Sequence, residues 1–353
     1  MMSSGAFGYL GDYVFYWLVY LSLVVHTWCF FRFVRLKMRR GPALMIGNGL
    51  IFFCLVGAAA LAGESYLRFA GVATDSFGVS LPARRWFALH TRLNSAGFRD
   101  VEWDRAKRPG VHRIAFVGDS FTYGWGVENP DDRFPDIIRK RLEHLSPGKF
   151  EVLNASKPGW NTADGQAAIR DLRGRYSIDE VVLCHVPNDI EDVIPATAEF
   201  DPLHPPEPVF FNVDSSCLLD FLYRRLYLPR LPSVRGYHDW LAEGYASPDI
   251  FDKHRKSLTA MAQFRDENGI KLRVVLVPFL KVGGSRLDQA AVHGRMRSVL
   301  EALSIEVVDL LEAVQGIPPD ELVVSAQDAH PSARAHALFA DAVFQAFFSG
   351  TNR

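Results

Sequence analysis

The sequence carries almost no net charge, with 39 basic and 40 acidic side chains among 353 residues. A protein that binds nucleic acid through its phosphates needs a clear excess of lysine and arginine on one surface. The balanced charge therefore argues against nucleic acid as a partner. The sequence also has no internal repeat and no low-complexity tract, and its length allows one large domain or two smaller ones.

Cysteine is scarce, with four in the whole chain. Cys29 and Cys54 lie in long apolar runs, Cys184 lies in a shorter one, and Cys217 lies in a loop-like region. This distribution does not fit a disulfide framework, although a Cys184–Cys217 bridge is left open. There is no CxxC motif and no cluster of cysteine and histidine suited to zinc. We therefore expect neither a metal nor another cofactor.

Charged residues are missing from residues 13–31 and 44–63. Each run is about 20 residues long, the length that a helix needs to cross roughly 30 Å of hydrocarbon. The alternative for the first run is a secretory signal peptide, but such a peptide has a basic region before its core. No basic residue precedes the first run here. The sequence therefore predicts two membrane spans, with residues 1–63 as a two-helix anchor.

The short stretch between the two runs predicts the orientation of this anchor. Residues 1–12 carry only Asp12, whereas the stretch carries five basic residues: Arg32, Arg35, Lys37, Arg39 and Arg40. Because basic loops stay in the cytoplasm, the N-terminus and everything after Gly63 should lie on the other side. We therefore expect a protein of the bacterial inner (cytoplasmic) membrane that works on its periplasmic or outer side. Binding of anionic lipid headgroups is a second possible use of the basic stretch.

Strand-like and helix-like patterns alternate from residue 111 onward, after a connector at 64–110. A proline-rich stretch at about 195–250 interrupts the pattern and is predicted to be an insertion with short helices. Five strands, each followed by a helix, predict an α/β fold with a parallel sheet covered on both faces. The expected strands are 113–117, 150–155, 179–186, 271–279 and 306–310, and the expected helices are 134–145, 162–176, 254–269, 289–303 and 333–348.

Polar residues follow several of these strands at the edge where a parallel sheet binds its ligands. Gly118-Asp119-Ser120 ends the first strand, and we expect Gly118 to permit a sharp turn. A serine hydroxyl attacks an ester only when a base removes its proton and a carboxylate orients the base. His330 and Asp328, two positions apart near the C-terminus, are suitable for these roles.

Acyl transfer also needs hydrogen-bond donors for the negative charge that develops on the substrate oxygen. The backbone amides of Ser120 and Gly159 and the side-chain amide of Asn188 are candidate donors. Gly159 follows the second strand and Asn188 follows the third. A glycine lets the backbone approach the substrate without a side chain in between.

These motifs resemble those of the SGNH/GDSL hydrolase family. The family's marks appear here in order as VGDSFTYGWG, KPGWN, VPND and DAHPS, within residues 111–349. The resemblance implies a flavodoxin-like three-layer sandwich with a five-stranded parallel sheet. It also implies Ser120 as nucleophile, His330 as base, Asp328 as its acid, and Ser120, Gly159 and Asn188 as oxyanion hole. GFRD at 97–100, together with the apolar runs, is similar to the bacterial membrane-anchored members.

The chain departs from the family pattern at two places. Many members have the acid three residues before the histidine, where this chain has Gln327. Relatives that handle polysaccharide acyl groups share the two-residue spacing, so Asp328 is the expected acid. The usual Gly-x-Asn-Asp is here Val186-Pro187-Asn188-Asp189.

Simpler roles are open for some of these residues. Ser120 could be only a helix N-cap, and Asp119 is expected to hold the turn through backbone amides. His185 is expected to pack in the core and His336 to lie on the solvated surface. Tyr123 and Trp125 either line a substrate pocket or pack beneath the loop.

Two functions from different classes remain. The first is a membrane-anchored serine esterase or O-acyltransferase that forms an acyl-Ser120 intermediate on acyl, mainly acetyl, esters of cell-envelope or exported glycans. The second is a non-catalytic scaffold subunit of a membrane complex. Small residues in the second run, such as Gly47 and Gly57, would then help the anchor pack against a partner's helices. The expected partners are an acylated carbohydrate or other small ester, the lipid bilayer, and in the scaffold case a membrane protein.

Overall fold

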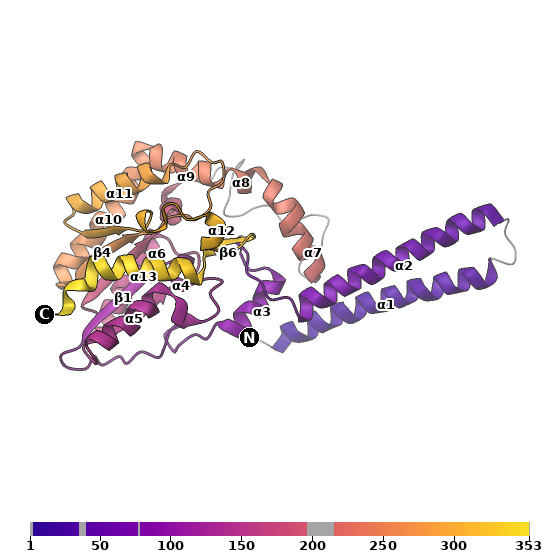
Figure 1. Ribbon diagram of the computed structural model, residues 1–353, viewed down its shortest axis with the longest axis horizontal. Helices are drawn as coiled ribbons and strands as arrows, with labels where there is room; N and C mark the ends of the chain where they lie inside the picture. The colour runs from indigo at the N-terminus through magenta and orange to yellow at the C-terminus, as the bar shows by residue number, and fades with distance from the viewer. Residues whose placement is uncertain (1–2, 35–39, 77, 196–214, 353) are drawn as a thin grey trace. The chain divides into compact units, whose positions relative to one another are not determined.

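The computed structural model describes residues 3–34, 40–76, 78–195 and 215–352 (Figure 1). The chain forms two compact units. The first contains residues 1–73, 77–86 and 206–230, and the second contains residues 74–76, 87–205 and 231–353. Most of the basic stretch at 32–40 and the middle of the predicted insertion, 196–214, lie outside the described residues.

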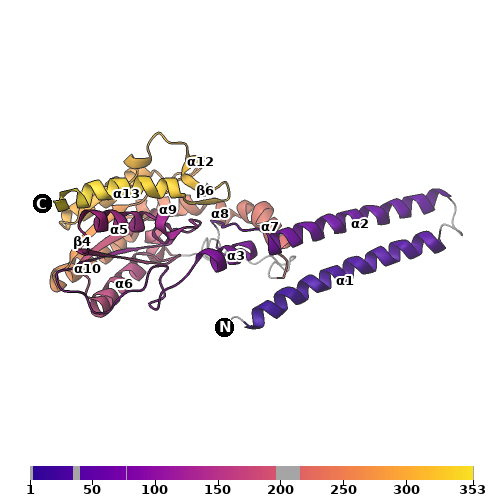
Figure 2. The same cartoon turned by 60° about the horizontal axis from the view of Figure 1, so that its bottom comes forward.

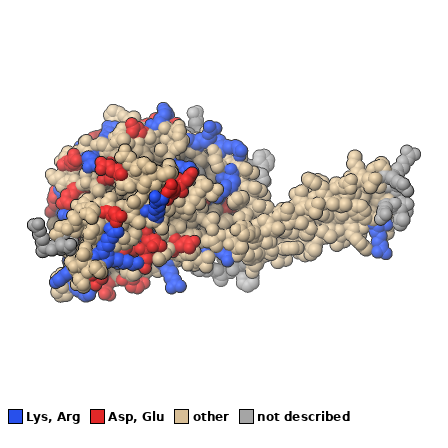
Figure 3. Space-filling model, in the orientation of Figure 1, with Lys and Arg blue, Asp and Glu red and all other residues tan. Residues whose placement is uncertain are grey.

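Two long helices form most of the first unit: α1 (Ser3–Phe33) and α2 (Arg40–Phe69). Both are long and apolar enough to cross a membrane, over Leu10–Phe33 and Gly41–Phe69. Most of their large apolar side chains are exposed, unlike those of a core helix in a soluble protein. Figure 3 shows this surface free of charged side chains over most of its length, whereas both signs of charge mix on the second unit.

Glycines allow α1 and α2 to pack closely against each other. A Cβ atom at Gly47 would lie 2.9 Å from Cζ of Phe31, and one at Gly57 would lie 3.0 Å from Cδ2 of Tyr20. These small residues thus accommodate rings of the neighbouring helix of the same chain. All four cysteines are free, so the Cys184–Cys217 bridge is not formed.

Shorter elements complete the first unit. A helical segment begins with α7 (Cys217–Leu222) and continues through a π-helical turn, η3 (Tyr223–Tyr227), and η4 (Leu228–Arg230). Helix α3 (Leu81–His90) begins in this unit.

The second unit contains the predicted five-stranded parallel sheet, in the order β2-β1-β3-β4-β5. This is the strand order of flavodoxin-like folds, in which the chain changes direction between β1 and β3. The prediction of the fold class is confirmed. The strands are β1 (His112–Gly118), β2 (Phe150–Ser156), β3 (Glu180–His185), β4 (Lys271–Leu276) and β5 (Glu306–Asp309).

Helices cover both faces of this sheet. Figure 2 shows α5 and α13 on one side and α6 and α10 on the other. Along β1, Ala115 and Val117 enter the core beneath α6 and α10, whereas Ile114 and Phe116 enter the core beneath α5 and α13. This alternation follows from the two-residue period of a strand. Both faces are therefore apolar, as a buried parallel sheet requires.

The helices of the second unit begin and end with local signals. Asn161 caps α6 through a capping box with Asp164, and Gly269 ends α10 at φ 59°. The longer helices are α5 (Phe134–Leu145), α6 (Thr162–Tyr176), α9 (Tyr237–Ala246), α10 (Pro248–Asn268), α11 (Gln289–Ala302) and α13 (Ala333–Phe348). The shorter ones are α4 (Ser120–Tyr123), η1 (Pro130–Asp132), η2 (Pro187–Val193), α8 (Pro232–Arg235), η5 (Glu312–Val314), α12 (Pro319–Leu322) and η6 (Ser349–Asn352).

Short helices occur in the described part of the predicted insertion: residues 231–250 form α8, α9 and the start of α10 within the second unit. An antiparallel hairpin of β6 (Val323–Ser325) and β7 (Asp328–Pro331) precedes α13. These two short strands were not among the five strands expected from the sequence.

Candidate active site

Close packing explains the glycine at the end of β1. A Cβ atom at Gly118 would lie 2.3 Å from Oγ1 of Thr122 and 3.0 Å from Cβ of Cys184. Gly118 is not among the glycines with positive φ. The expected conformational reason is therefore wrong, because the position needs glycine for space.

Asp119, rather than Ser120, caps the short helix α4. One carboxylate oxygen of Asp119 accepts a hydrogen bond from the amide of Phe121 at 2.9 Å. The side chain is 1% exposed, and this burial raises its pKa to about 6. Asp119 thus holds the turn as expected, which leaves the hydroxyl of Ser120 available for other contacts.

The β7 strand carries Asp328 and His330 to this turn. Residues two apart in a strand point to the same side, so the two side chains can meet directly. Oδ1 of Asp328 lies 2.6 Å from Nδ1 of His330, and Nε2 of His330 lies 2.9 Å from Oγ of Ser120. The structure therefore brings together the three residues that the sequence suggested for a triad.

Aromatic rings enclose the imidazole of His330. The Trp125 ring stacks on it with centroids 5.4 Å apart, and Phe121 lies at 5.2 Å. His330 is only 8% exposed, and Asp328 is fully buried. Of the two alternatives for Trp125, packing beneath the site is the one that the structure shows, while Tyr123 is also buried.

Residues 74–76 supply a contact that the sequence analysis missed. The hydroxyl of Thr74 donates to Oδ2 of Asp328, the oxygen that faces away from His330. The hydroxyl of Ser76 accepts from the amide of Ala329 at 2.7 Å. Thr74 is 4% exposed. Both oxygens of the Asp328 carboxylate therefore have partners, which a buried charge requires.

The candidate oxyanion donors lie at the ends of β2 and β3. Nδ2 of Asn188 is 3.5 Å from Oδ2 of Asp119, a long contact with the residue that precedes Ser120. Gly159 has φ 78°, a left-handed conformation that favours glycine, and a Cβ there would meet no atom within 4 Å. The amide of Lys157 in the same loop donates to the carbonyl oxygen of Gly118 at 3.2 Å.

The GFRD sequence supports the loop that follows Ser120. Arg99 is 1% exposed, and its guanidinium donates to the carbonyl oxygens of Gly124 and Val127 at 2.8 and 2.7 Å. Asp100 accepts from the amide of Asn154 in β2 at 2.8 Å. The sequence analysis noted GFRD without assigning these roles.

Several acidic groups lie behind the turn. Burial raises the pKa of Glu191 to about 7, and burial next to Asp119 raises the pKa of Asp189 well above its ordinary value. The hydroxyl of Tyr237 donates to Glu191. Burial of this kind commonly occurs near active sites.

Two other histidines, His185 and His336, are buried. Nε2 of His185 lies 3.1 Å from Nε2 of His254 inside the core, so His185 packs as expected. His336 was expected on the surface, and this is wrong. It is fully buried, where its Nδ1 accepts from the amide of Phe134 at 3.3 Å.

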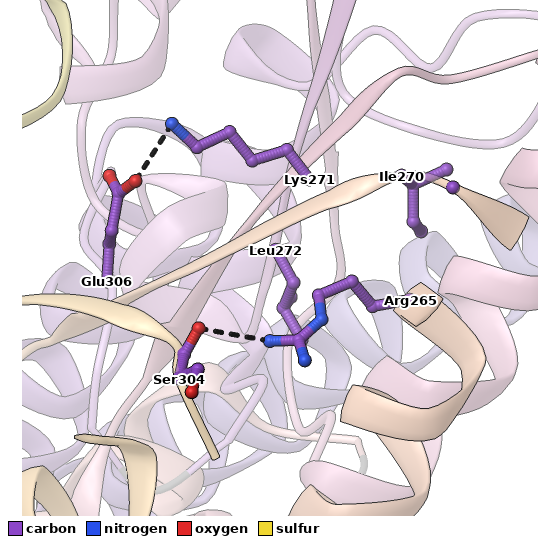
Figure 4. A pocket seen from close by; sticks show the side chains of 7 residues that line it. Arg265, Ile270, Lys271, Leu272, Ser304 and Glu306 are labelled. Atoms are coloured by element: carbon purple, nitrogen blue, oxygen red, sulfur yellow. Dashed lines mark hydrogen bonds and ion pairs between the residues drawn. The ribbon is translucent and has the colours of Figure 1, made fainter. Parts of the chain in front are cut away.

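Two surface hollows in the described part of the chain lie apart from Ser120, His330 and Asp328. One of about 370 Å³ lies where β4 and β5 begin, at the edge of the sheet opposite to Ser120 (Figure 4). It is lined by residues that include Arg265, Lys271 and Glu306. Another of about 580 Å³ lies beside α9, with Asp239, Glu243 and Arg286 in its wall. Among the described residues, no group of three or more His, Cys, Asp and Glu side chains could hold a metal ion.

The chain is similar to known proteins in sequence and in fold. The sequence model of the GDSL-like lipase/acylhydrolase family matches residues 116–338. No curated protein matches the sequence. A catalytic mutant of an acetylxylan esterase from Geobacillus stearothermophilus is 14% identical, with a TM-score of 0.45 over 71% of this chain and 99% of its own. A lipase from a goat rumen metagenome is 14% identical, with a TM-score of 0.45 over 68% and 99%. TesA is 18% identical, with a TM-score of 0.43 over 67% and 98%.

Proposed function

Because the chain belongs to the GDSL-like lipase/acylhydrolase family, we propose that it is a membrane-anchored serine esterase or O-acyltransferase. The observation that carries this proposal is the continuous line of contacts from Ser120 through His330 to Asp328, at 2.9 and 2.6 Å. Such an arrangement activates a serine hydroxyl, because the base accepts its proton while the carboxylate stabilises the cation that forms.

The reaction begins when Oγ of Ser120 attacks the acyl carbon and its proton passes to Nε2 of His330. The tetrahedral intermediate then collapses, and His330 returns that proton to the alcohol oxygen as the ester bond breaks. An acyl-Ser120 ester remains. Water attacks this ester in hydrolysis and a sugar hydroxyl in transfer, and in both cases His330 takes the attacking proton and returns it to Oγ of Ser120.

Three donors would stabilise the oxyanion: the amides of Ser120 and Gly159 and the side chain of Asn188. Each such donor contributes roughly 3–4 kcal/mol to lowering the barrier. Two observations support this role for Asn188: it follows β3 at the same edge of the sheet as Ser120, and its Nδ2 makes only a long contact, at 3.5 Å, with Oδ2 of Asp119.

Acyl esters of cell-envelope or exported glycans, mainly acetyl esters, are the proposed substrates. The two-residue spacing of Asp328 and His330 and the predicted location outside the cytoplasm support this class. The two long apolar helices support anchoring in a membrane. The basic stretch at 32–40 supports the proposed orientation in the bacterial inner membrane, with the family domain on the periplasmic or outer side.

Labelling of the detergent-purified chain with a fluorophosphonate probe tests the nucleophile. We expect the wild type to be labelled and Ser120→Ala to remain unlabelled, with both chains giving the same circular dichroism spectrum. A folded wild type that resists the probe would favour the scaffold function instead. Incubation with an acetylated oligosaccharide, with and without a second sugar, then distinguishes released acetate from transferred acetyl.

A reporter enzyme fused after residue 70 tests the orientation separately. Alkaline phosphatase should be active there, since it folds only outside the cytoplasm. Activity of a cytoplasmic reporter at the same position would reverse the proposed topology without affecting the triad.

A further inference from the structure

The helical segment of residues 217–230, here called the α7 segment, exposes four large apolar side chains and buries the carboxylate of Asp220. Its exposed side chains include Phe221 at 37%, Leu222 at 38%, Leu226 at 55% and Tyr227 at 47%. By contrast, Asp220 is only 3% exposed. A surface helix in water normally has the opposite arrangement.

Phe221, Leu222 and Leu226 form one apolar face, here called the apolar stripe, and Tyr227 lies at its side. Leu222 and Leu226 are four residues apart, and Phe221 and Tyr227 flank them on adjoining turns. Residues at this spacing lie on the same side of a helix. Arg225 lies over the ring of Phe221 at 5.3 Å, and Arg224 donates to Asp220 at 2.9 Å. Long basic side chains beside an apolar stripe are typical of helices that lie in a membrane interface.

A buried carboxylate fixes the start of the α7 segment to the end of α2. Glu64 accepts from the hydroxyl of Ser216 at 2.8 Å and from the amides of Cys217 and Leu218 at 3.1 and 2.8 Å. Arg68, one turn further along α2, donates to Glu64 at 2.7 Å. Because both charged side chains are 3% exposed, these bonds are needed to satisfy them.

This attachment lies just past Gly63, where the apolar run ends in the hairpin that α1 and α2 form. In the same part of the hairpin, the hydroxyl of Tyr13 pairs with Ser65 at 2.8 Å, and that of Tyr16 pairs with Ser215 at 2.9 Å. Tyrosine is enriched at this level of membrane proteins because its ring is apolar and its hydroxyl is polar. The opposite end of the hairpin carries the basic stretch at 32–40. The α7 segment therefore begins at the level of the lipid headgroups.

We propose that the α7 segment lies in the outer headgroup layer of a phospholipid bilayer, with Phe221, Leu222 and Leu226 inserted among the acyl chains. This inference rests on the membrane anchoring in the proposed function and adds a second lipid contact outside the two spans.

Spin labelling of the full chain in phosphatidylcholine–phosphatidylglycerol vesicles tests this location. A nitroxide is attached to Leu226→Cys in a chain whose four native cysteines are replaced by alanine, and its collisions with oxygen and with a nickel chelate are measured. We expect at least a severalfold excess of oxygen collisions, as lipid gives. The matched control is Leu145→Cys, since Leu145 is 42% exposed on α5 in the second unit, and it should favour the nickel chelate.

Labels at two further positions distinguish a failure of this inference from a failure of the membrane anchoring. A label at Phe52→Cys, on the exposed side of α2, should report lipid, and a label at Tyr227→Cys should repeat the result of residue 226. If residue 52 reports lipid but residues 226 and 227 report water, only the inference about the α7 segment fails. If residue 52 also reports water, the anchoring itself fails, whereas the serine-probe result is unaffected. Labels at 226 and 227 that neither reagent reaches would mean that protein covers the stripe, which also overturns the inference.

Discussion

The Thr74 hydroxyl offers the sharpest test of how the candidate triad is held. Thr74→Val removes this hydroxyl and keeps the shape of the side chain. Thr74 donates to Oδ2 of Asp328, while Oδ1 accepts from the backbone and the ring of His330 at 3.1 and 2.6 Å. In the variant, Oδ2 of a fully buried carboxylate loses this donor. The carboxylate would then be free to turn away from His330.

The size of the effect follows from the strength of this bond. A hydrogen bond to a charged group contributes roughly 1.5–3 kcal/mol, and about 1.4 kcal/mol corresponds to a tenfold change in rate. We therefore expect kcat for a chromogenic acetyl ester to fall roughly ten- to hundredfold. Replacing the acid itself in a Ser-His-Asp enzyme costs about 10⁴-fold, which sets the upper bound. KM should change little, since Thr74 contacts Asp328 rather than the proposed substrate site.

Two variants separate this positioning role from a general loss of structure. Thr74→Ser retains a hydroxyl and should recover most of the activity. Thr259→Val removes a threonine hydroxyl that bonds within α10, to the carbonyl oxygen of Arg255 at 2.9 Å, and should keep full activity. The reasoning is refuted if Thr74→Val retains wild-type kcat, or if Thr74→Ser is as impaired as Thr74→Val while both unfold at the wild-type temperature.

Three other predictions concern the second unit. Burial lowers the pKa of His254 to about 4 from 6.5, so the folded chain binds fewer protons than the unfolded chain as pH falls from 6.5 to 4. The free energy of unfolding, measured by denaturant titration, should therefore fall less between pH 7.5 and pH 4.5 in His254→Gln than in the wild type, by up to about 3 kcal/mol. An equal fall in both chains would contradict this. Gly118→Ala should cost roughly 1–3 kcal/mol by overpacking against Thr122, and adding Thr122→Ala should recover part of this if the contact is the cause. Arg99→Met should lower the melting temperature and make the Gly124–Val127 loop more sensitive to protease, because it removes charged donors to buried carbonyl oxygens; wild-type proteolysis would argue against this role.

The sheet could be predicted from the sequence because each strand is a short, nearly continuous apolar run. Such runs are typical of strands that are buried on both faces. The buried position of His336 could have been predicted from a similar pattern. It shares one face of α13 with Phe339, Ala340 and Val343, which are all buried. The helical spacing of these residues already indicated an inward position for His336.

The three residues of the candidate triad could be found because each lies in a recognisable motif at the end of a strand or before a helix. Thr74 could not be found in this way. It lies in a stretch without a regular pattern and meets Asp328 across 254 residues of sequence. Glu64 and Arg68 mark a similar limit in the anchor. The apolar run ends at Gly63, yet α2 continues to Phe69. In this last part of the helix Glu64 and Arg68 pair with each other, and Glu64 also accepts from the start of α7.

The contacts of residues 74–100 mean that the part of the chain that holds the candidate triad is larger than the segment that the family match covers. The match begins at residue 116, whereas Asp328 is held by Thr74, β7 by Ser76, and the loop after Ser120 by Arg99. A fragment that starts at residue 111 would contain the whole sheet and all three triad residues. It would nevertheless leave a buried carboxylate oxygen and several buried carbonyl oxygens without these donors, each at a cost of roughly 1–3 kcal/mol. Because domains are stable by only about 5–15 kcal/mol, such losses together are large enough to disorder the site. Only four residues separate Thr74 from the end of α2, so the part of the chain that completes the acid's environment follows directly on the second apolar helix.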